Sequence, residues 1–243
     1  MNLCIDEGNS SLKIAVFEGE SIVFSNTYNE IDFHELSRII KEFKIEYCIL
    51  SSVVETNTLL IDFLINNTEE FINLTHTTLL PIANNYKTPE TLGKDRLAAI
   101  VGASTILPAT DILVIDAGTA ITYDFIDASG KYHGGNIAPG IEMRLKSLHQ
   151  FTQKLPLLPV NCDVEILGSD TSSAIQAGVL YGIVFEIDGY IERLMLKYPK
   201  LSVFLTGGSA VCFDNKLKNR IFANKNLVVT GLNRILKYNV QSR

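Results

Sequence analysis

Two stretches of the sequence join an apolar run to an aspartate and a glycine, a combination suited to binding a phosphate or a cation. In residues 113–122 (LVIDAGTAIT) the run ends at Asp116, and Gly118 follows two residues later. An aspartate at the end of a buried strand needs a cation or hydrogen-bond donors to offset its desolvation. Gly118 lets the backbone approach a ligand, and the hydroxyls of Thr119 and Thr122 can donate to an oxyanion. Taken alone, the stretch is equally typical of an ordinary turn between two strands.

The start of the chain repeats this pattern. Residues 3–13 (LCIDEGNSSLK) again place an aspartate, Asp6, at the end of an apolar run. Aligning Asp6 with Asp116 also aligns Gly8 with Gly118. The repeat predicts a duplicated fold that has one phosphate-facing hairpin in each half.

The segment after each aspartate pattern alternates apolar and polar residues. These segments, 13–19 and 121–127, are typical of the second strand of a hairpin. Pro108 ends an alanine-rich helical pattern between the two copies, so the boundary falls close to it. We therefore divide the chain into domains of residues 1–110 and 111–243.

After each hairpin, apolar residues recur at helical spacing in some segments and in short unbroken runs in others. This alternation of helix and strand predicts an α/β fold. The expected helices are 33–43, with an N-cap at Asp32, 57–66, 97–107, 141–151 and 171–196. The N-terminal turn of the third helix is expected to carry Asp95 and Arg96. The expected strands after the hairpins are 47–50 and 201–205. Residues 81–89, 134–140 and 152–164 are expected to be loops because they are rich in glycine or proline or lack periodicity.

The composition argues against several classes of protein. The 243 residues are 47% hydrophobic and 20% charged, which is enough for packed cores. A net charge of −6 argues against a nucleic-acid-binding surface. No continuous apolar run has the length of a membrane span, and the first residues read as a strand and not as a leader peptide. We therefore expect a cytoplasmic protein without a nucleic-acid or membrane partner.

The four cysteines are far apart in the sequence and form no C-x-x-C pair. They are Cys4, Cys48, Cys162 and Cys212, three of them in apolar stretches. We expect them to be small buried thiols of a reducing compartment.

The two hairpins, together with the loop Thr206-Gly207-Gly208 after an apolar run, resemble the acetate and sugar kinase/Hsp70/actin superfamily. That resemblance implies two tandem RNase H-like (actin-like ATPase) domains with the active site in the cleft between them. It also implies that the hairpins contact the phosphates of ATP and that the glycine loop contacts the adenosine. The sequence has no G-x-x-x-x-G-K-[ST] motif, so a P-loop is not expected.

Ordered motifs over most of the chain narrow the resemblance to the type III pantothenate kinases. They are Asp6-x-Gly8-Asn9-Ser10-x-x-Lys13, Gly93-Lys94-Asp95-Arg96, Asp116-x-Gly118-Thr119-Ala120-x-Thr122, Gly134-Gly135-x-Ile137-x-Pro139-Gly140, Thr152-x-x-Leu155-Pro156, Thr171-x-x-Ala174-x-x-x-Gly178 and Thr206-Gly207-Gly208. The resemblance implies phosphorylation of pantothenate by ATP, the first step of coenzyme A biosynthesis. It further implies a homodimer that uses Mg²⁺ and a monovalent cation, K⁺ or NH₄⁺. Ser10 and Gln153 depart from the commoner family residues but remove no charged group.

The same resemblance implies roles for single residues. Asp95 corresponds to the general base, Asp116 to the ligand of the monovalent cation, and Thr119 to a nucleotide contact. The phosphate loop falls on Asp6, Glu7, Gly8, Asn9, Ser10, Ser11, Leu12 and Lys13. The pantothenate contacts fall on Tyr86, Gly93, Lys94, Asp95, Arg96 and Thr171. These roles are chemically reasonable, because a carboxylate can accept the proton of a primary hydroxyl and a guanidinium fork fits a carboxylate.

Two other functions are compatible with parts of the sequence. One is a non-enzymatic, nucleotide-dependent partner protein on the same fold, which the absence of a substrate-binding or polymer-forming extension disfavours. The other is a metal-dependent phosphodiesterase of the RNase H type, with Asp6, Asp95 and Asp116 around two metals. The low content of basic residues disfavours this second alternative.

Overall fold

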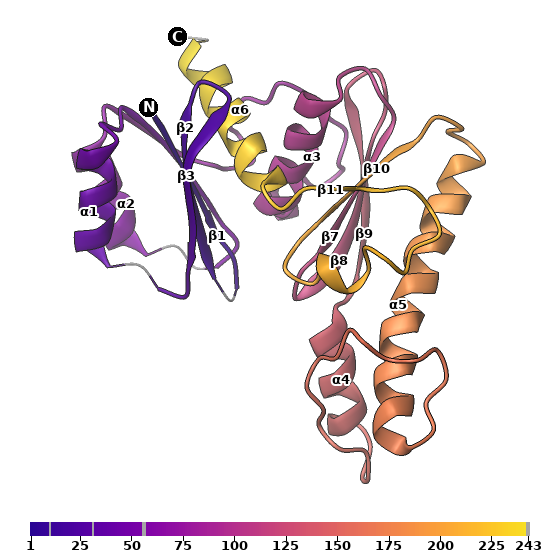
Figure 1. Cartoon of the computed structure of the whole chain (residues 1–243). Helices are drawn as coiled ribbons and strands as arrows, with labels where there is room; N and C mark the ends of the chain where they lie inside the picture. Colours follow the sequence, from indigo (N-terminus) through magenta and orange to yellow (C-terminus); the bar gives the residue numbers. More distant parts are fainter. Residues whose placement is uncertain (10, 31, 55–56, 242–243) are drawn as a thin grey trace. The chain divides into compact units, whose positions relative to one another are not determined.

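The structure is a computed structural model that describes residues 1–9, 11–30, 32–54 and 57–241 (Figure 1). It is mixed α/β, which confirms the class that the sequence predicts. The chain forms two compact units. Unit 1 consists of Met1–Ala109, Ser129–His133 and Asn226–Arg243, and unit 2 consists of Thr110–Ala128 and Gly134–Lys225. The division at residues 110 and 111 was drawn from the sequence repeat and stays a prediction.

Unit 1 contains a mixed sheet with the strand order β3-β2-β1-β4-β5. Its strands are β1 (Asn2–Glu7), β2 (Leu12–Glu18), β3 (Ser21–Tyr28), β4 (Tyr47–Ser52) and β5 (Glu70–Asn73). The first three form an antiparallel meander, whereas β4 and β5 run parallel to β1. The expected first hairpin is therefore present, and it lies next to a parallel strand whose carboxyl end shares its edge of the sheet.

Helices α1 (Phe33–Glu42) and α2 (Thr58–Asn67) begin and end within one residue of the predicted ranges. Leu36, Ile39 and Ile40 form the buried face of α1, the i, i+3, i+4 pattern that predicted this helix. The carboxylate of Asp32 accepts a hydrogen bond of 2.7 Å from the backbone N–H of Glu35, so the expected N-cap is also confirmed.

Helices α3 (Lys94–Ile106) and α6 (Leu227–Gln241) pack closely together in unit 1. A Cβ added at Gly231 would lie 2.7 Å from the carbonyl carbon of Ala98, and one at Gly102 would lie 3.1 Å from the amide nitrogen of Gly231. Glycine at both positions therefore lets the two backbones approach each other. The first turn of α3 carries Asp95 and Arg96, as the sequence predicts, whereas α6 was not predicted.

Helix α6 is also fixed to the first hairpin through a buried asparagine. The side chain of Asn233, which is fully buried, accepts a hydrogen bond of 2.8 Å from Asn2 and donates one of 3.0 Å to the carbonyl of Gly19. A buried amide with both ends paired avoids the cost of an unsatisfied polar group. The end of the chain therefore stabilises the fold at its beginning.

Unit 2 is built around the second hairpin. In the strand order β11-β10-β7-β8-β9-β6, strands β7 and β8 are antiparallel, and β10 and β11 run parallel to β7. The strands are β7 (Ile112–Ala117), β8 (Ala120–Ile126), β9 (Lys131–Pro139), β10 (Ser202–Thr206) and β11 (Phe222–Ala223). Within unit 1, the short β6 (Ala83–Asn84) pairs with the first residues of β9. Short 3₁₀ helices occur at η1 (Pro89–Thr91) and η2 (Ala210–Cys212).

Two predicted loops contain strand. Residues 134–140 were expected to be a loop because of their glycines and proline, but β9 runs through Pro139. A Cβ added at Gly135 would lie 2.7 Å from the carbonyl carbon of Tyr123 on β8, so glycine there permits close contact between backbones. The predicted loop 81–89 likewise contains β6.

Helices α4 (Ile141–Gln150) and α5 (Thr171–Met195) each end one residue before the predicted end. Among the described residues, α5 is the one helix with the length and composition of a membrane span. Half of its most apolar segment is buried within the protein, as in the core helix of many folded domains, so the observation is weak evidence for a membrane.

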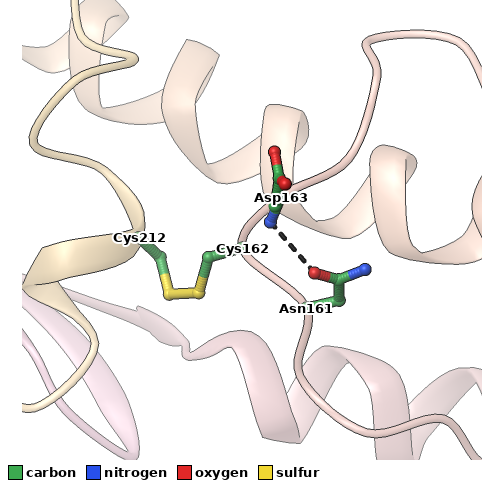
Figure 2. Close-up of a disulfide and its surroundings, with 4 residues drawn as sticks. All are labelled: Asn161, Cys162, Asp163 and Cys212. Atoms are coloured by element: carbon green, nitrogen blue, oxygen red, sulfur yellow. Dashed lines mark hydrogen bonds between the residues drawn. A yellow bond between two sulfur atoms is a disulfide. The ribbon is translucent and has the colours of Figure 1, made fainter.

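The prediction of four free thiols is wrong for two of the cysteines. Cys162 and Cys212 form a disulfide between the segment after α4 and the 3₁₀ helix η2, with their Cα atoms 4.9 Å apart (Figure 2). The bridge closes a loop over a sequence separation of 50, for which the chain-entropy model gives about 4 kcal/mol of stabilisation. Cys4 and Cys48 are free and buried, as expected. Burial raises the pKa of both thiols, so they are poor nucleophiles.

Candidate active site

In unit 1, the first hairpin places a carboxylate opposite an ammonium group. Asp6 on β1 pairs with Lys13 on β2, and it also lies beside Ser51 on the parallel strand β4. Residues directly opposite in an antiparallel pair have neighbouring side chains on one face. The ammonium nitrogen of Lys13 donates a hydrogen bond of 3.0 Å to Oδ1 of Asn226, just before α6. A residue near the end of the chain therefore orients the predicted phosphate lysine.

The turn of this hairpin is closed by a hydrogen bond of 2.9 Å from the amide of Gly8 to the carbonyl of Ser11. Asn9 and Ser11 are exposed on the turn, and Glu7 ends β1. Ser10 lies outside the described residues. The side chain of Leu12 belongs to the hydrophobic core, so only its backbone is available to a ligand.

The Gly93–Arg96 motif forms the start of α3. Gly93 is the N-cap, Lys94 is the first helical residue, and Asp95 lies in the first turn. The carboxylate of Asp95 accepts a hydrogen bond of 2.8 Å from the amide of Arg96. A Cβ at Gly93 would lie 2.6 Å from Oδ1 of Asp95, so this glycine leaves room for the carboxylate to fold back on the helix start.

Arg96 is buried, with 6% of its surface exposed. Its guanidinium carbon lies 5.8 Å from the centre of the Tyr86 ring, within the range of a cation–π interaction. The Tyr86 ring stacks on Tyr132, with 6.2 Å between ring centres and 19° between ring planes. Asp95 and Arg96 therefore do not form an exposed ion pair. The structure brings Arg96 next to Tyr86, and both residues are predicted to contact pantothenate.

In unit 2, the second hairpin places Asp116 near the end of β7, where it is half-buried. Asp116 pairs with Thr122 on β8 and with Thr206 on the parallel strand β10. The amide of Gly118 donates a hydrogen bond of 3.1 Å to the carbonyl of Ala120 and closes the turn, on which Thr119 is exposed. Asp116, Thr122 and Thr206 thus lie side by side on three adjacent strands, at the same end of the sheet.

The glycine loop after β10 lies against this carboxylate. Gly207 has a φ of +93°, and a Cβ there would lie 2.5 Å from the carbonyl carbon of Ala117 and would overlap Oδ1 of Asp116. The amide of Ser209 donates a hydrogen bond of 2.9 Å to the carbonyl of Ala117. The loop and the hairpin therefore form one packed unit around Asp116.

Thr171 is the first residue of α5 and is exposed. Asp170 caps the helix by accepting hydrogen bonds from the amides of Ser172 and Ser173, at 2.8 and 3.0 Å. The backbone hydrogen bond from Ser173 is the main reason that the pKa of Asp170 lies below its usual range. Thr171 also lines a cavity of about 660 Å³ between α4 and α5. Its other lining residues are Arg144, Ser147, Leu148, Leu155, Ala174, Ile175, Gly178 and Val179.

The predicted site residues thus fall into groups within each unit. Tyr86, Arg96 and Asp95 belong to one group in unit 1, and Asp6 and Lys13 face each other in the first hairpin. Asp116 and Thr119 share the second hairpin in unit 2, whereas Thr171 lies at the start of a separate helix. No group of three or more His, Cys, Asp or Glu side chains suited to a metal occurs in the part of the chain that the structure describes.

Sequence reasoning missed the residues that support these groups. Asn226 contacts Lys13 across 213 positions of sequence, and no local pattern predicts such a pair. Tyr132 is fully buried under Tyr86, and the pairing of Asn84 with Tyr132 in β6 and β9 brings the two rings together. The tyrosine was visible in the sequence, but the strand pairing that gives it this position was not.

Comparisons with known proteins find similar chains along nearly the whole length. A family model described as Type III pantothenate kinase matches residues 2–193. A Type III pantothenate kinase of Phocaeicola vulgatus is 48% identical over 241 residues, which cover 98% of this chain and 99% of that protein. A solved structure from Campylobacter jejuni, provisionally described as a Baf family transcriptional activator, is 27% identical with a TM-score of 0.62, covering 98% of this chain and 99% of that one.

A second solved structure extends the likeness in fold. It comes from Sinorhizobium meliloti and is provisionally described as a 2-dehydro-3-deoxygalactonokinase. It has a TM-score of 0.60 at 13% identity, covering 98% of this chain and 99% of that one. At this identity the likeness concerns the fold alone, and it confirms the predicted sugar-kinase and actin-like class.

Neighbouring glycines of the loop after β10 provide a matched test of its packing. Gly207→Ala introduces a side chain at a positive φ and against Asp116, so we expect a loss of about 2 kcal/mol, or about 4–8 °C in Tm. Gly208→Ala is the control, because an added Cβ there meets no atom within 4 Å. Thermal unfolding followed by circular dichroism measures both. Equal Tm values for the two variants would contradict the close packing of Gly207.

Proposed function

The chain belongs to the type III pantothenate kinase family, and on this premise we propose that it transfers the γ-phosphoryl group of ATP to the primary hydroxyl of pantothenate, with Asp95 as the general base. It is thus a kinase of coenzyme A biosynthesis, and the product is 4′-phosphopantothenate. The observation that carries the residue assignment is the start of α3. There Asp95 lies in the first turn and Arg96 is buried against Tyr86.

Asp95 would orient the substrate hydroxyl and accept its proton as the oxygen attacks the γ-phosphorus. Phosphoryl transfer depends more on positioning and charge neutralisation than on covalent chemistry, so a carboxylate held by its own helix start is adequate. Glycine at position 93 leaves the space that this carboxylate occupies, because a Cβ there would lie 2.6 Å from Oδ1 of Asp95. Gly93 and Lys94 would contribute backbone contacts to the same substrate.

Arg96 would bind the carboxylate of pantothenate. A guanidinium offers two parallel donors that match a carboxylate, and the contact with Tyr86 limits its orientations before the substrate arrives. Tyr86 would pack against the apolar part of the substrate. Thr171, exposed at the start of α5, would donate its hydroxyl to a polar group of pantothenate.

The nucleotide would be held by the hairpins. Residues 6–13 and Thr119 supply backbone amides, hydroxyls and one lysine, which are donors that suit phosphate oxygens. Asp6 would hold Mg²⁺ through water, and Mg²⁺ would neutralise the charge of the phosphates when bound. Lys13 would add a second positive charge, and its hydrogen bond to Asn226 orients the ammonium group.

Asp116 would hold a monovalent cation, K⁺ or NH₄⁺. The residues around it fit such an ion: one carboxylate, the hydroxyl residues Thr122 and Thr206 beside it in register, and carbonyls of the turn. The close approach of Gly207 leaves no room for a side chain at this edge. A large, weakly hydrated cation accepts such an irregular set of oxygen ligands better than Mg²⁺, which prefers regular octahedral geometry.

We also propose that the protein is a homodimer in the cytoplasm, without a nucleic-acid or membrane partner. Exposed large apolar side chains in unit 2 support self-association. They include Ile137, Met143, Phe151, Leu167 and Phe185. The net charge of −6 disfavours nucleic acid. Sedimentation equilibrium is expected to give twice the mass of the chain, and the mass of one chain at every concentration would refute the dimer.

Replacing Asp95 tests the proposed base. Asp95→Asn keeps the shape of the side chain but removes its basicity, so we expect kcat to fall by about 10²-fold or more while ATP still binds. Steady-state kinetics and calorimetric ATP binding measure the two effects. Glu90→Gln is the control, because Glu90 is an exposed carboxylate shortly before α3. A kcat of Asp95→Asn close to that of the control would exclude a general-base role.

The monovalent cation is tested by exchanging the salt. In sodium-only buffer with excess Mg²⁺ we expect low activity that recovers when K⁺ is added, because Asp116 beside ATP requires a neutralising ion. Asp116→Asn should weaken this activation. The measurement is pantothenate-dependent ADP release at constant ionic strength. Full activity in buffer free of K⁺ and NH₄⁺ would reject the monovalent-cation site.

A further inference from the structure

A charged hydrogen-bond network in unit 2 joins β8, α4 and α5 through side chains that have no assigned catalytic role. The carboxylate of Glu186 on α5 accepts a hydrogen bond of 2.7 Å from the hydroxyl of Tyr123 on β8. Its other oxygen accepts one of 2.7 Å from the guanidinium of Arg144 on α4. The side chains of Arg144 and Glu186 are only 22% and 27% exposed, so water screens this pair less than a surface pair. Helices α4 and α5 lie side by side (Figure 1).

The network continues from Arg144 to the turn before α4. Nε of Arg144 donates a hydrogen bond of 2.8 Å to the carbonyl of Pro139. The same guanidinium therefore binds a backbone carbonyl and a carboxylate at once, a geometry that lysine cannot reproduce. Arg144 thus holds the Pro139–Gly140 turn in position, and Glu186 of α5 holds Arg144.

The Pro139–Gly140 turn rests directly on the second hairpin. The amide of Gly140 donates a hydrogen bond of 3.1 Å to the carbonyl of Thr119. A Cβ at Gly140 would lie 2.5 Å from the carbonyl oxygen of Gly118 and closer still to that of Thr119, so glycine is required for this contact. A displacement of the turn would therefore be transmitted to the backbone of Gly118 and Thr119.

Tyr123 on β8 also connects the network to the second hairpin. Tyr123 pairs with Ile115, the residue before Asp116, and is 2% exposed. Burial first, and then the hydrogen bond to Glu186, raise the pKa of Tyr123 well above its usual value, so the hydroxyl remains a donor at neutral pH. The hairpin is thus held at its strand by Tyr123 and at its turn by Gly140.

We propose that Arg144 and Glu186 are positioning residues for the nucleotide contact at Thr119. They hold the Pro139–Gly140 turn, which holds the backbone of Thr119 in the conformation that presents its hydroxyl to ATP. This inference rests on the proposed nucleotide contact of Thr119.

Glu186→Gln is the main test, because it removes the negative charge that pairs with Arg144 and replaces one of the two acceptor oxygens with an NH₂ group. We expect the KM for ATP to rise by about 5- to 20-fold, at or below the roughly 10- to 150-fold that a lost charged hydrogen bond corresponds to, because the effect reaches Thr119 only through the backbone. The KM for pantothenate should change by less than about twofold. Tyr123→Phe is the second variant and should have a smaller effect in the same direction. Arg144 lines the cavity beside Thr171, so substitutions of Arg144 are less specific to ATP.

Glu142→Gln provides the matched control. Glu142 pairs with Lys146 on the same helix α4, but both side chains are largely exposed. This control should leave both KM values unchanged. Calorimetric titration of ATP gives a binding readout for all variants that does not depend on turnover, and Tm reports their folding.

Thr119→Ala, measured in parallel, separates this inference from the proposed function. Weaker ATP binding in Thr119→Ala and in Glu186→Gln supports the positioning role. Weaker binding in Thr119→Ala alone overturns the positioning role and leaves the nucleotide contact intact. Unchanged ATP binding in Thr119→Ala overturns both. A fall in Tm of Glu186→Gln and Tyr123→Phe with unchanged ATP binding means that the network is only structural.

Discussion

Asp116 lies near the end of β7, directly after a run of buried residues. The elements around it leave room for a half-buried carboxylate and place hydroxyl residues beside it. The cost of desolvating a charge grows as water is excluded, so each neighbour must offer a donor or leave space for a cation. The register places Thr122 and Thr206 on either side, and Gly207 brings backbone against the carboxylate without adding a side chain. The hairpin, the glycine loop and the parallel strand β10 are therefore consequences of one constraint, and the proposed ion completes the set of partners.

The first hairpin meets the same constraint with different partners. Asp6 lies opposite Lys13, so part of the compensating charge is built into the hairpin. Lys13 in turn depends on Asn226, which precedes α6, and α6 is fixed by the buried Asn233. The proposed phosphate loop of unit 1 is thus supported by a helix from the far end of the sequence. This explains why unit 1 combines both ends of the chain.

Features set by neighbouring residues were predictable from the sequence. The spacing of Leu36, Ile39 and Ile40 and the cap at Asp32 predicted α1, because helix period and capping are local. The apolar run before Asp116 predicted β7, because a short unbroken apolar run is also a local signal. Motif resemblance, not geometry, assigned roles to Asp95 and Arg96, since a charged pair at a helix start is common.

Features set by distant residues were not predictable. The glycines at 134 and 135 indicated a loop, yet the strand β9 forms because Gly135 permits close contact with Tyr123 on β8. The disulfide of Cys162 and Cys212 requires knowing that their Cα atoms lie 4.9 Å apart. The pairing of Arg144 with Glu186 spans 42 positions. Its effect on the second hairpin depends on another hydrogen bond of Arg144, to the carbonyl of Pro139.

The two hairpins share a sequence pattern, but the structures that support them differ. In both, a glycine turn follows an aspartate, and the turn closes through a backbone hydrogen bond from Gly8 or Gly118. A short hairpin turn has few internal hydrogen bonds, so its conformation must be stabilised by packing from outside. Unit 1 uses α6 and Asn226, whereas unit 2 uses the turn before α4 and the network of Arg144 and Glu186. The duplicated feature is the aspartate–glycine hairpin, and each half of the chain supports it with different residues.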